Sequence, residues 1–96
     1  MGIRRETEET FLRTVLAYAR LRGWLCYHTR DSRRSLEGFP DLVCTRDTRC
    51  VVAELKSKTG RTTAAQRRWL AAFAACGIAA YVWRPQDWTE IEETLR

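Results

Sequence analysis

Two carboxylates and one ammonium group make the middle of the chain a candidate site for chemistry. They are Asp41, Glu54 and Lys56, within the stretch GFPDLVCTRDTRCVVAELKSK at residues 38–58. Hard divalent cations prefer carboxylate oxygens as ligands. A cation held in this way lowers the pKa of its bound water and neutralises phosphoryl oxygens. Paired carboxylates beside a lysine therefore make this stretch a candidate site for a divalent cation.

A β-hairpin is the element that would bring these three charges together. Residues 41–46 and 50–56 read as strands rich in β-branched and apolar side chains, with a tight turn near Asp47 and Thr48. In that register the numbers of paired residues sum to 95, so Asp41 is predicted to lie opposite Glu54. Directly opposed residues share a face, with their Cβ atoms about 5 Å apart.

Lys56 shares the face of the two carboxylates, because side chains alternate along a strand. Like charges directly opposite one another destabilise a sheet, so something must offset the repulsion. A divalent cation is one candidate. A simple surface ion pair with Lys56 is the other. The opposite face carries residues typical of a core: Leu42, Cys44, Val51, Ala53 and Leu55.

Two predicted helices each place one polar residue within an apolar stripe. Residues 6–22 form the first, in which Glu8 points in the direction of Phe11 and Val15 at about 100° per residue. Residues 63–76 form the second, in which Gln66 has the same relation to the apolar side chains. We interpret Glu8 as a carboxylate aimed at the charged cluster. Gln66 is spaced to complete a capping box with Thr63, so capping and a role in the site both stay open.

Basic and hydroxyl-bearing residues flank the cluster in two predicted loops. The net charge is +5, and residues 56–86 contain six basic side chains and no acidic one. A surface that carries only positive charge suits a polyanion such as nucleic acid. The alternative is a basic surface that is merely solvated. Arginine, lysine and hydroxyl groups are common phosphate contacts. The predicted contacts are Arg30, Ser32, Arg33, Arg34, Ser35, Lys58, Arg61 and Arg67.

The remaining elements complete an α/β sandwich around a small mixed sheet. A strand is predicted at residues 24–29, and another at 78–84. Asp87 is placed to cap a last short helix. The predicted order is helix, three strands, helix, strand, helix. The length of 96 residues suits one domain.

The composition argues against several other kinds of site and setting. The four cysteines form no C-x-x-C pair and His28 is the sole histidine, which argues against structural zinc. We interpret the cysteines as reduced. His28 either touches DNA or packs against its neighbours. No secretory signal or membrane-spanning run is visible, which favours a cytoplasmic protein without membrane partners.

Five short pieces of the chain form a recognisable set in their order and spacing. They are Thr7-Glu8, Gly38-Phe39-Pro40-Asp41, Glu54-Leu55-Lys56, Thr62-Thr63-Ala64-Ala65-Gln66 and Tyr81-Val82-Trp83-Arg84-Pro85. Together they resemble the VRR-Nuc family of the PD-(D/E)XK nuclease superfamily. The resemblance extends over nearly the whole chain and implies that residues 1–96 form a single VRR-Nuc-like nuclease domain. The implied fold is α/β, a restriction-endonuclease-like core of order αβββαβα.

The resemblance also implies roles for the site residues. It assigns Asp41 and Glu54 to Mg²⁺ or Mn²⁺, with the backbone carbonyl of Leu55 and the carboxylate of Glu8 as further ligands. Lys56 would orient the attacking water or stabilise developing charge. Gln66 would support the site, so that the catalytic set is Asp41, Glu54, Lys56 and Gln66.

Stand-alone members of this family resemble Holliday-junction resolvases and act as homodimers. The resemblance therefore implies a homodimeric, metal-dependent DNA endonuclease that selects DNA by structure, with branched DNA as one candidate substrate. Two alternatives remain on the same fold. One is a nucleic-acid-binding module that does not cut, and the other is a subunit that depends on a partner protein.

Overall fold

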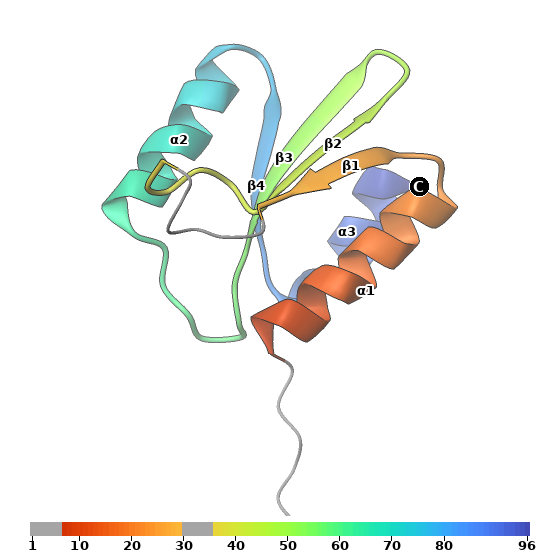
Figure 1. Ribbon diagram of the computed structural model, residues 1–96, viewed down its shortest axis with the longest axis horizontal. Helices are drawn as coiled ribbons and strands as arrows, with labels where there is room; N and C mark the ends of the chain where they lie inside the picture. Colours follow the sequence, from red (N-terminus) through yellow and green to blue (C-terminus); the bar gives the residue numbers. More distant parts are fainter. Residues whose placement is uncertain (1–6, 30–35) are drawn as a thin grey trace, which may run out of the picture.

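A four-stranded sheet with helices on both faces forms the molecule (Figure 1). The structure is a computed structural model, and it describes residues 7–29 and 36–96. In chain order the elements are α1 (Glu8–Leu21), β1 (Leu25–His28), β2 (Leu42–Arg46), β3 (Arg49–Leu55), α2 (Ala64–Ala75), β4 (Ala79–Trp83), the 3-10 turn η1 (Pro85–Asp87) and α3 (Trp88–Leu95). The predicted order αβββαβα is therefore confirmed.

The strands lie in the order β1-β2-β3-β4, which confirms the mixed sheet. The β1–β2 and β2–β3 pairs are antiparallel, whereas β3 and β4 are parallel. The β2–β3 pairing joins Leu42 with Ala53 and Arg46 with Arg49, which is the predicted register. Asp47 has a φ of 53° at the turn, a left-handed conformation that aspartate adopts more readily than most residues.

The main core lies between the sheet and the pair α1 and α3. Apolar side chains repeat along α1 at helical spacing, and α1 packs against β1, β3 and α3. The core residues are Phe11, Val15, Leu16, Ala19, Trp24, Leu42, Cys44, Val51, Ala53, Leu55, Trp83, Ile91 and Leu95. The predicted apolar face of the hairpin is therefore the face that this core covers.

The opposite face of the sheet is covered by α2, which contacts β3 and β4 (Figure 1). No residue of α2 is buried, yet Val52 and Glu54 beneath it are. β3 is thus buried on both faces. The charged face of the hairpin is not a solvated surface, because α2 lies over it.

The starts of α1 and α3 differ from the sequence-based expectation for local reasons. The first helix begins at Glu8, because the hydroxyl of Thr7 accepts a hydrogen bond from the backbone N–H of Thr10 and caps it. Asp87 does not cap α3 through its side chain. Its carboxylate instead accepts a hydrogen bond from the backbone N–H of Arg84, at 2.9 Å, and so closes the 3-10 turn. Among the residues described, none of the helices is long and apolar enough to cross a bilayer.

Candidate active site

The predicted charged cluster forms where β2 begins and β3 ends. Asp41 precedes β2, and Glu54 lies near the end of β3, one step beyond the Leu42–Ala53 pair. The Asp41 side chain extends the hydrogen bonding between β2 and β3. Its Oδ2 accepts a hydrogen bond of 2.9 Å from the backbone N–H of Leu55. The hairpin register therefore brings Asp41 and Glu54 to one end of the sheet, as the sequence predicted.

Glu54 is a buried acid, with 3% of its surface exposed. Its Oε2 lies 3.8 Å from the Lys56 ammonium nitrogen, and the Lys56 side chain is itself only 11% exposed. The surface ion pair considered as an alternative is therefore not what the structure contains, because the pair is withdrawn from water. An ionised buried carboxylate is costly unless nearby groups compensate it.

The surroundings of Glu54 raise its pKa from a usual value near 4.5 to about 8. Burial is the largest cause, and the negative charge of Asp41 acts in the same direction, whereas the positive charge of Lys56 opposes both. The second oxygen of Glu54, Oε1, is buried and has no hydrogen-bond partner within residues 7–29 and 36–96. The positive charge and the hydrogen-bond donors around Glu54 thus do not fully compensate its carboxylate when it is ionised.

Gln66 both caps α2 and contacts Glu54. Its Oε1 accepts a hydrogen bond of 2.8 Å from the backbone N–H of Thr63, and the Thr63 hydroxyl accepts one from the backbone N–H of Gln66. This reciprocal pair is a capping box at the start of α2. The Gln66 amide nitrogen then donates to Glu54 Oε2 at 2.8 Å. The cap fixes the amide, and the fixed amide holds one oxygen of Glu54.

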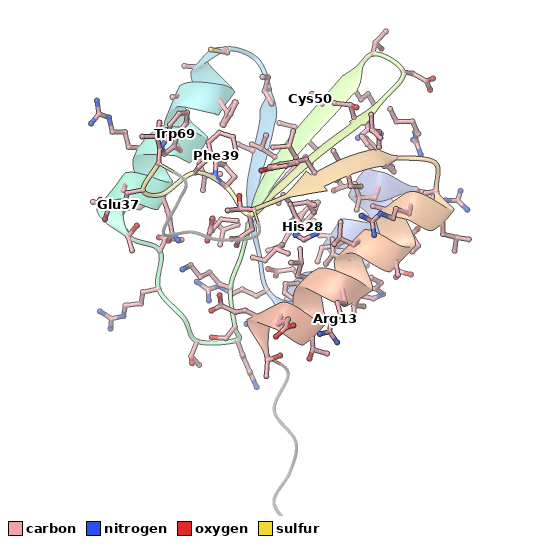
Figure 2. All side chains as sticks on the ribbon, in the orientation of Figure 1. Arg13, His28, Glu37, Phe39, Cys50 and Trp69 are labelled. Atoms are coloured by element: carbon pink, nitrogen blue, oxygen red, sulfur yellow. The ribbon has the colours of Figure 1, made fainter. Side chains whose placement is uncertain are left out.

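The loop before Asp41, residues 36–40, is anchored on α2. Gly38 has a φ of 84°, and a Cβ built on it would lie 2.5 Å from the carbonyl carbon of Ala65. Only glycine allows so close an approach. Phe39 packs edge-on against Trp69, with ring centroids 5.0 Å apart, and the Trp69 indole donates to the carbonyl of Glu37 (Figure 2). The Gly-Phe-Pro run thus ties the start of β2 to α2.

Glu8 borders a small cavity at the same end of the sheet. The cavity has a volume of about 150 Å³ and is lined by Glu8, Glu9, Leu12, Asp41 and Leu55. Glu8 itself is exposed at the first turn of α1, which meets the end of β3 from the other side (Figure 1). Three of the four predicted metal ligands therefore line one cavity, and Glu54 interacts electrostatically with the Asp41 at its wall.

The four predicted ligands do not form a closed cage. In the part of the chain that the structure describes, no group of three or more histidine, cysteine, aspartate or glutamate side chains is gathered to hold a metal ion. The donor set is still suited to a hard cation, because it consists of carboxylates and a backbone carbonyl. The partnerless Oε1 of Glu54 and the raised pKa of this group are what a cation beside it would correct.

Arg84 was not among the site residues that the sequence predicted. Its guanidinium donates a hydrogen bond of 2.8 Å to the carbonyl of Ser57, directly after Lys56. The Ser57 hydroxyl accepts one from the backbone N–H of Gly60, and Gln86 donates to the carbonyl of Lys58. The end of β4 therefore holds the loop that follows Lys56. The available signal was an arginine placed between β4 and Pro85.

The predicted phosphate contacts are described only in part. Lys58, Arg61 and Arg67 are exposed, and the Arg67 guanidinium donates to the carbonyl of Thr62 at 2.7 Å, which braces the loop before α2. His28 is half-buried, and its Nδ1 meets no hydrogen-bond partner among the described residues. The other predicted contacts lie outside the described residues: Arg30, Ser32, Arg33, Arg34 and Ser35.

Comparison with known proteins places this arrangement among nucleases. A family model described as the VRR-NUC domain matches residues 4–87. A solved structure described as a VRR_NUC domain protein has a TM-score of 0.72 at 18% identity, covering 95% of this chain and 86% of that chain. Hjc of Archaeoglobus fulgidus, described as a Holliday junction resolvase from an archaeal hyperthermophile, has a TM-score of 0.60 at 25% identity, covering 78% of this chain and 66% of that chain.

None of the curated proteins matches the chain. The two solved structures share its arrangement of helices and strands, which confirms the predicted restriction-endonuclease-like core.

Proposed function

Because the chain belongs to the VRR-NUC domain family, a family of nuclease domains, we propose that it is a metal-dependent DNA endonuclease with residues 1–96 as its single catalytic domain. The observation that carries this proposal is the buried Glu54 carboxylate, which has one oxygen without a partner among the described residues and lies beside Asp41. Carboxylates are seldom buried in this state unless they serve a site.

Glu8, Asp41, Glu54 and the carbonyl of Leu55 would hold Mg²⁺ or Mn²⁺. When bound, such an ion supplies an activated water and neutralises charge on the scissile phosphate. The cavity of about 150 Å³ has room for a small hydrated cation, since one water occupies roughly 30 Å³ in the liquid. Glu8 closes the set from α1, directly or through water.

The other site residues position and compensate these ligands. The Leu55 N–H fixes one oxygen of Asp41, and the Gln66 amide fixes one oxygen of Glu54. Each carboxylate is therefore oriented before a cation or a phosphate arrives, which lowers the cost of assembling the transition state. Lys56 supports the negative charge of Glu54, and its ammonium group is placed to orient the attacking water or to stabilise charge on the phosphate.

The substrate that fits this surface best is DNA recognised by its structure. Lys58, Arg61 and Arg67 offer charge to a phosphate backbone, which contributes affinity without reading base sequence. The likeness to Hjc supports branched DNA as the substrate class. One chain carries one site, and cutting two strands of a branch requires two sites. We therefore propose that the active species is a homodimer.

The test is cleavage of labelled four-way junction, flap, duplex and single-stranded DNA in Mg²⁺, Mn²⁺ or EDTA. Wild type is compared with Asp41→Asn, which keeps an acceptor for the Leu55 N–H but removes the charge. Asp47→Asn is the matched control, because this residue lies in the hairpin turn and asparagine tolerates its left-handed conformation.

We expect cleavage that requires metal, loses at least about 100-fold in Asp41→Asn and is unchanged in Asp47→Asn. Cleavage that persists in Asp41→Asn would overturn the site. Binding without cleavage in either metal would support the alternative of a non-cleaving nucleic-acid-binding module. Cleavage that appears only with a second protein would support a partner-dependent subunit.

A further inference from the structure

Two cysteines face each other across the β1–β2 ladder, outside the candidate active site. Cys26 on β1 is paired with Cys44 on β2, and their sulfur atoms lie 3.2 Å apart. Both are free thiols in the structure. The Cys44 thiol donates a hydrogen bond to the Cys26 sulfur, so the two sulfur atoms already point at one another.

The position of this pair in the ladder suits a cross-strand bond. The Thr29 N–H donates to the carbonyl of Asp41, which makes Thr29 and Asp41 a hydrogen-bonded pair. Hydrogen-bonded and non-hydrogen-bonded pairs alternate along antiparallel strands, so Cys26 and Cys44 form a non-hydrogen-bonded pair. Their Cα atoms are then about 4.5 Å apart, which is within the range of about 4.4–6.8 Å found in disulfides.

The two sulfur atoms differ in exposure. Cys44 is fully buried, and burial together with the neighbouring Cys26 raises the pKa of its thiol well above the usual range. Cys26 is half-buried and lies on β1, a strand at the edge of the sheet. A small oxidant coming from solvent therefore reaches Cys26 before Cys44, and Cys44 stands directly behind it to resolve the product.

The other two cysteines are not placed to compete. Cys50 pairs with Thr45 in the β2–β3 ladder, one position away from the Cys44–Val51 pair, so its side chain points to the opposite face of the sheet. Cys76 is exposed and lies at the C-terminal end of α2. Proximity alone thus selects one pair among the four thiols.

We propose that Cys26 and Cys44 are a site of peroxide modification that closes into an intramolecular disulfide. The Cys26 thiolate attacks one oxygen of hydrogen peroxide, the O–O bond breaks, and the displaced hydroxide takes up a proton to leave as water. The Cys44 sulfur then attacks the resulting sulfenic acid, the S–O bond breaks, and the hydroxyl leaves as a second water with the thiol proton. Two thiols lose two electrons, and one peroxide is reduced to two waters.

The bond would brace the segment that carries Asp41 without altering the charged cluster. Closing it moves the sulfur atoms together by about 1 Å, to the usual disulfide length near 2.05 Å. The pair lies on the face of the sheet that packs against the main core, whereas Asp41 and Glu54 lie on the face toward α2. The inference does not depend on the proposed nuclease function.

The test treats the full chain with a small excess of hydrogen peroxide, followed by trypsin digestion without reductant. Trypsin cuts after lysine and arginine, and it places each of the four cysteines on a different peptide. We expect a product lacking two hydrogens, with peptide 23–30 joined to peptide 35–46. Free thiols should fall from four to two, and dithiothreitol should restore them.

The melting temperature should rise by about 10 °C or more on oxidation, because closing a loop of this size in the unfolded chain contributes about 3 kcal/mol. Cys26→Ser should abolish the cross-link, whereas Cys76→Ser should retain it. The proposal is overturned if Cys26 is recovered as sulfinic acid, if it joins Cys50, or if the product is a disulfide between chains through Cys76. The peptide map of the wild type decides among these outcomes even where a variant folds poorly.

Discussion

The two faces of the sheet are built in opposite ways. The face toward α1 and α3 is a closed apolar core, in which Phe11, Ile91 and Leu95 are almost fully buried. The face toward α2 has a helix without a buried residue, and beneath it lies the buried acid Glu54. The first face supplies stability through burial of apolar surface. The second carries charge at the expense of stability, which is the usual condition of a site.

The strongest way to test this difference is to remove one large side chain from each face. Phe11→Ala should lower the free energy of unfolding by about 3–5 kcal/mol, because it leaves a cavity in a core that cannot collapse fully. Phe73→Ala, on the half-buried face of α2, should lower it by about 1–2 kcal/mol. Urea unfolding followed by circular dichroism measures both values. Equal losses would show that the two faces are equally packed.

The next test concerns the contact that ties Asp41 to α2. Gly38→Ala should lower the free energy of unfolding by about 2–3 kcal/mol, because Gly38 has a positive φ and its added Cβ would collide with the backbone of Ala65. Cleavage should fall with it, since the loop that positions Asp41 must shift. Gly77→Ala is the matched control, because Gly77 also has a positive φ but has open space around it. If both variants behave alike, backbone strain alone explains the effect.

A third test uses the charge on the α2 face. The pKa of Glu54 is about 8 in the folded protein against a usual value near 4.5, so the folded state holds the proton more tightly than the unfolded state. The stability from this group is therefore complete below about pH 4.5 and is lost as the pH rises through 8. Without metal, we expect wild type to unfold more easily at pH 8.5 than at pH 5.

Glu54→Gln should remove this pH dependence and stabilise the metal-free protein at pH 8.5 by about 1–2 kcal/mol relative to wild type. Urea titrations in EDTA at the two pH values measure the effect. Added Mg²⁺ should restore stability to wild type and leave Glu54→Gln nearly unchanged, because the variant lacks the charged ligand. A wild-type stability that is constant or increases between pH 5 and 8.5 would contradict the unfavourable charge at this face.

The difference between the two faces also explains which features could be predicted from the sequence. The hairpin register followed from one turn and two alternating strands, and the positions of Asp41, Glu54 and Lys56 followed from the register. These are short-range patterns with a period of two. Two alternatives were predicted for Gln66, because a glutamine at this position is consistent with a capping box and with a hydrogen bond to the site.

Other features depend on contacts between distant segments, which no local pattern encodes. The burial of Glu54 results from α2 lying over β3, and an acidic residue in a strand predicts exposure instead. The close approach of Gly38 to Ala65 joins residues 27 positions apart. Asp87 was expected to cap α3, but a nearer backbone N–H at Arg84 takes up its carboxylate. In each case tertiary packing selected one of several locally allowed partners.

The smallest expected effect on stability concerns Arg84, at the junction of β4 and the loop after Lys56. Arg84→Met removes the hydrogen bond to the Ser57 carbonyl but keeps the length of the side chain, so the free energy of unfolding should fall by only about 0.5–1 kcal/mol. Cleavage should fall more than stability predicts, by about 10-fold, because the loop no longer holds Lys56 and Lys58 in place.

Arg67→Met is the control, since Arg67 also braces a loop through a carbonyl but lies in the first turn of α2 and holds Thr62, in the loop before that helix. Single-turnover cleavage separates the two roles of these arginines. A loss confined to the cleavage step in Arg84→Met, with DNA affinity retained, identifies a positioning residue of the catalytic lysine. A matching loss of affinity in both variants would mean that the two arginines contribute only positive charge, and the end of β4 would then belong to the binding surface rather than to the charged face beneath α2.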